Sequence, residues 1–148
     1  MSSLNKIIST LIIEVIGKPP EHLTKKLKEI SERINEEKDV EVKDKKINDS
    51  KPMEKQKGYF VNFAEIEVEV KNLERLFFLV IKYLPAHIEI ISPEKLNLEN
   101  NDLNTPLNEV SRKFHQYDHV ARVLQSEKNV LEKKFKALSD PKKESKGK

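Results

Sequence analysis

Two histidines at helical spacing are the side chains of this sequence best suited to metal chemistry. His115 and His119 are four residues apart in the segment HQYDH, and Asp118 lies beside them. On a helix this spacing places both imidazoles on one face, where they can hold a transition metal. The glutamate of an HExxH motif is missing, which excludes zinc-protease chemistry. Both histidines fall outside the apolar stripe of their own segment. We interpret them as a surface pair, with a divalent-metal site as the alternative.

Five glutamates form a second group that could do chemistry, on one face of a predicted β-sheet. They are Glu14, Glu65, Glu67, Glu69 and Glu89. Neighbours on the same face of a strand lie roughly 7 Å apart, whereas a hard cation needs oxygens that converge. We therefore interpret this group as a solvated strand face, with metal binding or hydrolytic chemistry as the alternative.

The segment KGYFVNF, residues 57–63, resembles the RNA-contacting strand of the RNA recognition motif family. The resemblance implies base stacking on two aromatic rings that share one face of the strand. The Gly/Ala position of that pattern is missing here, and Tyr59 and Phe60 are adjacent, so they point to opposite faces. Alternation instead places Phe60 with Ile66 in the core and Tyr59 with Phe63 beside the glutamates. Carboxylates repel phosphate, which disfavours RNA binding by this face.

Composition removes most other kinds of active site. The chain has no cysteine, which excludes disulfides, thiolate catalysis and cysteine-ligated metals. Its three glycines cannot assemble a P-loop or a dinucleotide-binding fingerprint. We expect no enzymatic activity, no metal and no cofactor.

The elements that position these residues follow from the apolar pattern of residues 8–98. The predicted elements, in chain order, are a strand at 10–17, a helix at 21–37, strands at 39–45 and 59–70, a helix at 73–84 and a strand at 86–92. The order βαββαβ predicts an α+β domain, a ferredoxin-like two-layer sandwich over 8–98. The polar, lysine-rich stretch at 44–58 is predicted to be a long mobile hairpin loop. Asn72 is the predicted N-cap of the second helix.

The second helix has more apolar residues than one buried stripe requires. The predicted inner stripe is Leu73, Leu76, Phe77, Val80 and Leu84. Phe78, Leu79 and Ile81 are then predicted to lie on the outer face. A helix that is apolar nearly all round is usually buried all round. We therefore expect the long C-terminal helix, a second subunit or another protein to cover this face.

A long amphipathic helix is predicted for residues 105–138, followed by a disordered basic tail at 139–148. Apolar residues recur at alternating steps of three and four, and only Lys128 interrupts them. The nine residues of this seam are Leu107, Val110, Phe114, Tyr117, Ala121, Leu124, Leu131, Phe135 and Leu138. Such a repeat, sustained over four heptads, predicts a coiled coil or a long docking helix.

The net charge of +3 arises from residues 132–148, where seven lysines stand against three acidic residues, and the rest of the chain sums to −1. The loop at 44–58 offers a second basic cluster, which is mixed with acidic residues. Its lysines are the candidate contacts for nucleic acid or an acidic partner, and they are Lys45, Lys46, Lys51, Lys55 and Lys57.

These patterns indicate a non-enzymatic adaptor or assembly protein that forms a homodimer through the helical seam or the sheet edges. Glu14 interrupts the N-terminal apolar run, and LFFLVIKYL (76–84) is too short to span a bilayer. We therefore expect a cytoplasmic protein without a membrane partner. The alternative is an RNA- or ribosome-associated protein that binds through the lysine loop and tail. A third hypothesis, a small-molecule regulatory domain, rests on analogy of fold alone.

Overall fold

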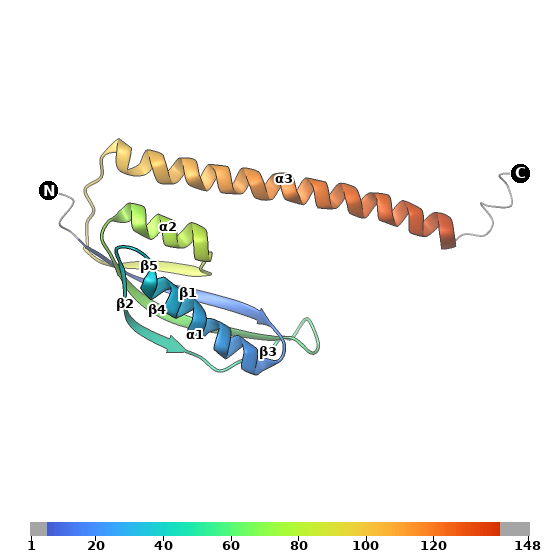
Figure 1. Ribbon diagram of the computed structural model, residues 1–148, viewed down its shortest axis with the longest axis horizontal. Coiled ribbons are helices and arrows are strands. Elements are labelled where there is room, and N and C mark those ends of the chain that lie inside the picture. Colours follow the sequence, from blue (N-terminus) through green and yellow to red (C-terminus); the bar gives the residue numbers. More distant parts are fainter. Residues whose placement is uncertain (1–5, 140–148) are drawn as a thin grey trace, which may run out of the picture. The chain divides into compact units, whose positions relative to one another are not determined.

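The computed structural model describes residues 6–139, which form two compact units. The first unit runs to Leu107 and contains an antiparallel sheet with two helices, and the second begins at Asn108 and is helical (Figure 1). The protein is therefore α+β, with a five-stranded antiparallel sheet and a long C-terminal helix. The predicted tail at 140–148 lies outside the described residues.

The sheet is built around two central strands of equal length. β1 (Ile7–Gly17) and β4 (Phe60–Val70) each have 11 residues and pair along their whole length, from Ile7 opposite Val70 to Gly17 opposite Phe60. β2 (Val40–Ile47) pairs with the other edge of β4, and β5 (His87–Ser92) with the other edge of β1. The strand order is thus β2-β4-β1-β5.

One face of the central strands carries the hydrophobic core. The alternation predicted for β4 is confirmed, because Ala64, Ile66 and Val68 are fully buried. α1 (Pro20–Glu36) covers this face with a stripe that includes Leu27 and Ile34, and its prolines stand at the helix start as predicted. A β-branched strand and a helix with one apolar stripe are each stable only when these surfaces meet.

α2 (Leu73–Tyr83) begins as predicted, since the Asn72 side-chain oxygen accepts a hydrogen bond from the Arg75 backbone N–H at 3.0 Å. The face that it buries differs from the predicted face. Leu79 is fully buried beside Leu76, so its predicted place on the outer face is wrong. Leu84, predicted for the inner stripe, is 59% exposed.

The physical reason for this difference is that nearly every position of α2 is apolar. Periodicity alone then cannot fix the rotation of the helix about its axis. The charged residues indicate the rotation of α2. Arg75 and Lys82 both lie over the Phe78 ring, and both form hydrogen bonds to the residues that directly follow α1. The outward side consequently consists of Phe77, Val80, Ile81 and Leu84, of which the first three are half-buried.

The predicted hairpin loop at 44–58 is partly structured. β2 continues to Ile47, whose side chain packs against the core, and a bulge at Lys43 separates its two halves. A short strand, β3 (Lys51–Pro52), pairs with the first residues of β4. The prediction of a loop failed here because exposed lysines occupy an edge strand, where charged side chains are common.

α3 (Asn100–Ser139) begins five residues earlier than predicted. The Asp102 carboxylate accepts a hydrogen bond from the Glu99 backbone N–H at 2.9 Å and so caps the first turn. Pro106, predicted for the first turn, lies inside the helix and is buried within the first unit. With 40 residues, α3 is about 60 Å long.

The rotation of α2 generates a stability prediction. We expect Leu79→Ala to lower the free energy of unfolding by roughly 2–5 kcal/mol, because it leaves a cavity in the core. Leu84→Ala, the matched control at an exposed site, should change it by about 0.5 kcal/mol or less. Urea denaturation of both variants measures this difference. Equal losses would contradict the rotation described here.

Candidate interaction surfaces

The predicted seam of α3 is exposed along the single chain. Eight of its nine residues are classed as exposed, and Val110 is half-buried. The exposed fraction reaches 65% for Leu131 and 72% for Phe135. From Leu107 to Ser139 no residue is buried.

The steps of three and four assign heptad positions to the seam. Leu107, Phe114, Ala121, Lys128 and Phe135 occupy a positions, and the d positions are occupied by Val110, Tyr117, Leu124, Leu131 and Leu138. Lys128 is the one charged side chain of the seam, and its ammonium lies 3.9 Å from the Glu132 carboxylate one turn along the helix.

Exposed valines lie outside the seam, and sequence analysis did not single them out. Val120 and Val123 lie near the middle of α3, and Val130 lies in its last third. All three are exposed. Leu103 was also missed, because the helix was expected to start after it, although it lies one step of four before Leu107 and so extends the repeat.

The predicted partner-binding residues of α2 do not form one outer patch. Leu79 is part of the core. Phe78 is half-buried against that core, with the Arg75 guanidinium 4.4 Å from its ring centroid. Ile81 belongs to the outward side described above. Cation–ring contacts of this kind cover Phe78 and leave little of its ring for a partner.

β5 carries a second group of exposed apolar side chains. Ile88 and Ile90 lie opposite Leu11 and Ser9, on the side of the sheet that holds the helices, yet Ile90 is 40% exposed. The predicted inward direction is right, but burial is incomplete. Ile91 is exposed at a bulge, where the pairing with β1 shifts by one residue. Such a bulge makes an edge strand a poorer template for further pairing.

The lysines predicted as nucleic-acid contacts are all exposed. Lys45 and Lys46 lie on β2 and Lys51 on β3, while Lys55 and Lys57 lie in the turn before β4. Tyr59 at the end of this turn is exposed, and the ammonium of Lys18 lies 4.9 Å from its ring centroid. The structure thus places cations and one accessible ring at the same end of the sheet.

One glutamate of the open sheet face, Glu69, forms ion pairs with two lysines. The ammonium of Lys43 lies 2.9 Å from a Glu69 carboxylate oxygen, and that of Lys6 lies 3.8 Å from the other. Hydrogen bonding to Lys43 lowers the pKa of Glu69 below its ordinary value. Among residues 6–139 no three metal-ligating side chains gather closely enough to hold an ion.

The histidine pair is exposed on α3. His115 and His119 are both solvent-accessible, and neighbouring Asp118 binds Arg122 Nε at 3.0 Å. The Asp118 carboxylate, the third candidate ligand of a metal site, thus forms an ion pair with Arg122. This favours the interpretation of the two histidines as a surface pair.

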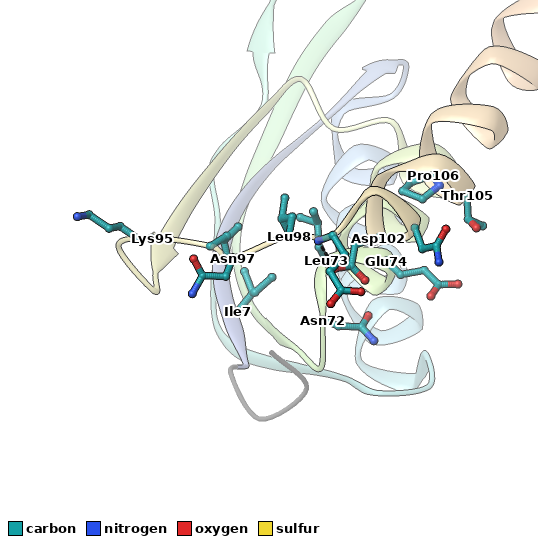
Figure 2. Close-up of a pocket in the computed structure, with 13 residues that line it drawn as sticks. Ile7, Asn72, Leu73, Glu74, Lys95, Asn97, Leu98, Asp102, Thr105 and Pro106 are labelled. Carbon is teal, nitrogen blue, oxygen red and sulfur yellow. Dashed lines mark hydrogen bonds between the residues drawn. The ribbon is translucent and has the colours of Figure 1, made fainter. Parts of the chain in front are cut away.

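A polar hollow of about 590 Å³ lies where α3 begins (Figure 2). Asn72 and Glu74 of α2 line one side, Asp102 and Pro106 of α3 another, and Ile7 lies at the base. The Lys95 side chain points away from the other lining residues (Figure 2). The lining includes Asn72 and Asp102, whose side-chain oxygens accept backbone hydrogen bonds at the starts of α2 and α3. No nucleophile with an adjacent base stands there.

A cluster of three polar side chains joins α1 to α2. One Glu37 carboxylate oxygen accepts hydrogen bonds from Lys82 Nζ and from the Tyr83 hydroxyl, each at 2.6 Å. The hydrogen bond from Lys82 lowers the pKa of Glu37, with that from Tyr83 adding to the effect. Desolvation, followed by the bond to Glu37, raises the pKa of Tyr83 to about 12.

The fold and surfaces described here define an α+β domain with an apolar helical extension. Residues 8–144 match the family model of the MJ0538 family, and the chain belongs to this family. The matched segment includes both the sheet and α3. No curated protein and no solved structure matches the chain. In the part of the chain that the structure describes, no helix is both long and apolar enough to cross a membrane.

The Glu37 cluster predicts how stability depends on pH. We expect Glu37→Gln to lower the free energy of unfolding by roughly 1 kcal/mol at pH 7, because the charge-assisted bonds are lost. Since the folded pKa of Glu37 is lowered, this contribution is present above 4.5 and disappears as the pH falls through the folded value. The raised pKa of Tyr83 has the opposite sign, so its contribution is lost as the pH rises from 10 towards 12.

Denaturation midpoints measured between pH 3 and pH 7 test this prediction. Glu36→Gln is the control, because Glu36 is an exposed glutamate next to the cluster. A difference between the Glu37 and Glu36 variants that stayed constant down to pH 3 would contradict the role of the ionised carboxylate.

Proposed function

We propose that this protein is a non-enzymatic assembly protein whose α3 pairs with α3 of a second copy. The observation that carries the proposal is the exposed seam of nine apolar residues on a helix that contributes nothing to the core beyond Leu107. Each leucine or phenylalanine of the seam would gain roughly 1.5–3 kcal/mol on leaving water.

The shape of this surface supports a helix as the partner. Spacing of three and four residues along five heptads matches the groove of another helix more closely than a flat sheet. A second copy offers the same seam with the same length, so it covers every exposed position at once. A small apolar ligand would cover one or two turns only.

For the first unit, we propose the ferredoxin-like arrangement as the finer description of the fold. The strand order β2-β4-β1-β5 supports it, and so do the connections, because α1 joins β1 to β2 and α2 joins β4 to β5 with one other strand between the joined strands in each case. This fold hosts many functions, so it does not by itself assign a function to the first unit. In the proposal the first unit carries α3 and presents a surface of its own. The lack of cysteine is consistent with a cytoplasmic protein.

The seam predicts the effect of charged substitutions on the oligomeric state. We expect Leu124→Asp together with Leu131→Asp to convert a dimer to a monomer, because buried unpaired carboxylates are strongly unfavourable. Ser126→Asp with Asn129→Asp is the matched control, since it adds the same two negative charges on the outward side of the same turns. Sedimentation velocity at micromolar concentration measures both. Unchanged sedimentation of the first variant would contradict the proposed interface.

A second candidate function is binding of RNA by the lysine-rich end of the sheet. The exposed lysines of 45–57 and the Tyr59 ring beside Lys18 favour it. Phosphate contacts by lysines and stacking on one aromatic ring are the usual components of such binding.

This candidate predicts a steep dependence of binding on salt. Lys51→Gln, Lys55→Gln and Lys57→Gln together should weaken binding to single-stranded RNA and reduce the salt slope by about two, at roughly 0.7 for each lost phosphate contact. Lys25→Gln, Lys26→Gln and Lys28→Gln, three exposed lysines of α1, serve as the control. Fluorescence anisotropy at 50–200 mM salt measures the effect. Absence of binding at the lowest salt would eliminate this candidate.

A further inference from the structure

The ten seam positions of α3 from Leu107 to Leu138 are arranged symmetrically along the helix. Their centre lies between Arg122 and Val123. Positions at equal distances from this centre are always one a position and one d position. The five pairs are Leu107 with Leu138, Val110 with Phe135, Phe114 with Leu131, Tyr117 with Lys128, and Ala121 with Leu124.

We propose that the second copy binds antiparallel, with the two helices centred on the point between Arg122 and Val123. This inference rests on the proposed function and specifies its geometry. In an antiparallel pair each a position faces a d position of the other chain, so the five pairs above become ten layers of contact. Every position of the seam from Leu107 to Leu138 is then covered, and Leu103 lies beyond the paired segment.

Packing distinguishes this arrangement from a parallel one. A parallel pair in register would place Phe114 against Phe114 and Phe135 against Phe135, but Ala121 against Ala121. Layers of such unequal volume produce overpacking next to a cavity, and both are destabilising. In the antiparallel pair Leu124 packs against Ala121 of the other chain, and Val110 packs against Phe135 of the other chain. Its layers are more uniform, as close packing requires.

Lys128 provides the second argument. In a parallel pair the two Lys128 side chains would meet in the seam and repel each other. In the antiparallel pair Lys128 faces Tyr117 of the second chain, and Asp118 follows that tyrosine by one residue. The lysine stem can then lie along the ring while its ammonium joins the ion pair that Asp118 makes with Arg122. In the single chain Tyr117 already has a lysine near its face, because Lys113 Nζ lies 5.6 Å from its centroid.

The exposed valine at position 120 fits the same geometry. Val120 occupies a g position, and in an antiparallel pair g positions of the two chains lie along the same edge. Val120 of each chain then lies near the centre of the interface, opposite Glu127 of the other chain, whereas a parallel pair would place it beside Gln125. The same arrangement places Lys113 of one chain near Lys134 of the other at one edge of the interface, and their like charges repel. Both lie at the rim, where solvent screens their repulsion.

The antiparallel arrangement has a consequence for assembly. The segment from Leu107 to Leu138 is 32 residues long, so its two ends lie roughly 50 Å apart. Because the sheet precedes the helix in each chain, the two helices enter the pair from opposite ends. The two chains therefore leave the pair towards their sheet units at opposite ends of it.

Single cysteines test the orientation directly, since the chain has none of its own. Under mild oxidation, Val110→Cys alone and Phe135→Cys alone should give no covalent dimer. An equimolar mixture of the two variants should give a disulfide between positions 110 and 135, identified by mass spectrometry of the linked peptides. Ser126→Cys, on the outward side, is the control and should remain unlinked. Disulfides between identical positions in either single variant would overturn the antiparallel inference.

A charge exchange tests the contact of Lys128. Lys128→Asp and Asp118→Lys should each weaken the dimer about tenfold, and the double variant should recover most of this loss. The two positions are ten residues apart, about 15 Å along one helix, so the recovery requires a second chain. In a parallel pair in register they remain about 15 Å apart, and no recovery follows. Losses that simply add in the double variant would therefore contradict the proposed contact.

The outcomes separate this inference from the proposed function. A chain that stays monomeric at all concentrations would remove both. A dimer that links position 110 to position 110 would keep the assembly function and remove the antiparallel geometry.

Discussion

The pairing of β1 with β4 is the interaction on which the first unit depends. The two strands exchange hydrogen bonds over 11 residues without a shift of register. A shift of β4 by one residue relative to β1 would turn Ile66 and Val68 to the open face and bring Glu65 and Glu67 under α1. The glutamates thus reinforce the register that the apolar residues set, because this shift would bury their charge.

The helices fit onto this pair in different ways. α1 covers it with a regular apolar stripe, whereas α2 is short and leaves Ile88 and Ile90 of β5 partly exposed. Among residues 6–139, those that are buried all lie in the first unit. The proposed pairing with a second copy would give the apolar residues of α3 a partner.

Much of this organisation could be predicted from the sequence. The alternation in β4, the Asn72 cap and the seam of α3 all follow from spacing of apolar residues and local hydrogen bonding. The rotation of α2 could not be predicted, because Leu79 and Leu84 look alike in a helix that is apolar all round. The start of α3 was missed since Thr105 and Pro106 resemble a helix beginning, while the actual cap at Asp102 lies in a polar stretch of ambiguous pattern. The extension of β2 depends on its partner β4, and such long-range pairing leaves little local signal.

The mass of the unmodified chain in solution tests the central claim most directly. Light scattering coupled to size exclusion, over a range from nanomolar to micromolar concentration, should show a transition from 17.3 kDa to twice this mass. A mass of 17.3 kDa at every concentration would contradict the account, because the seam of α3 would then have no second copy to cover it.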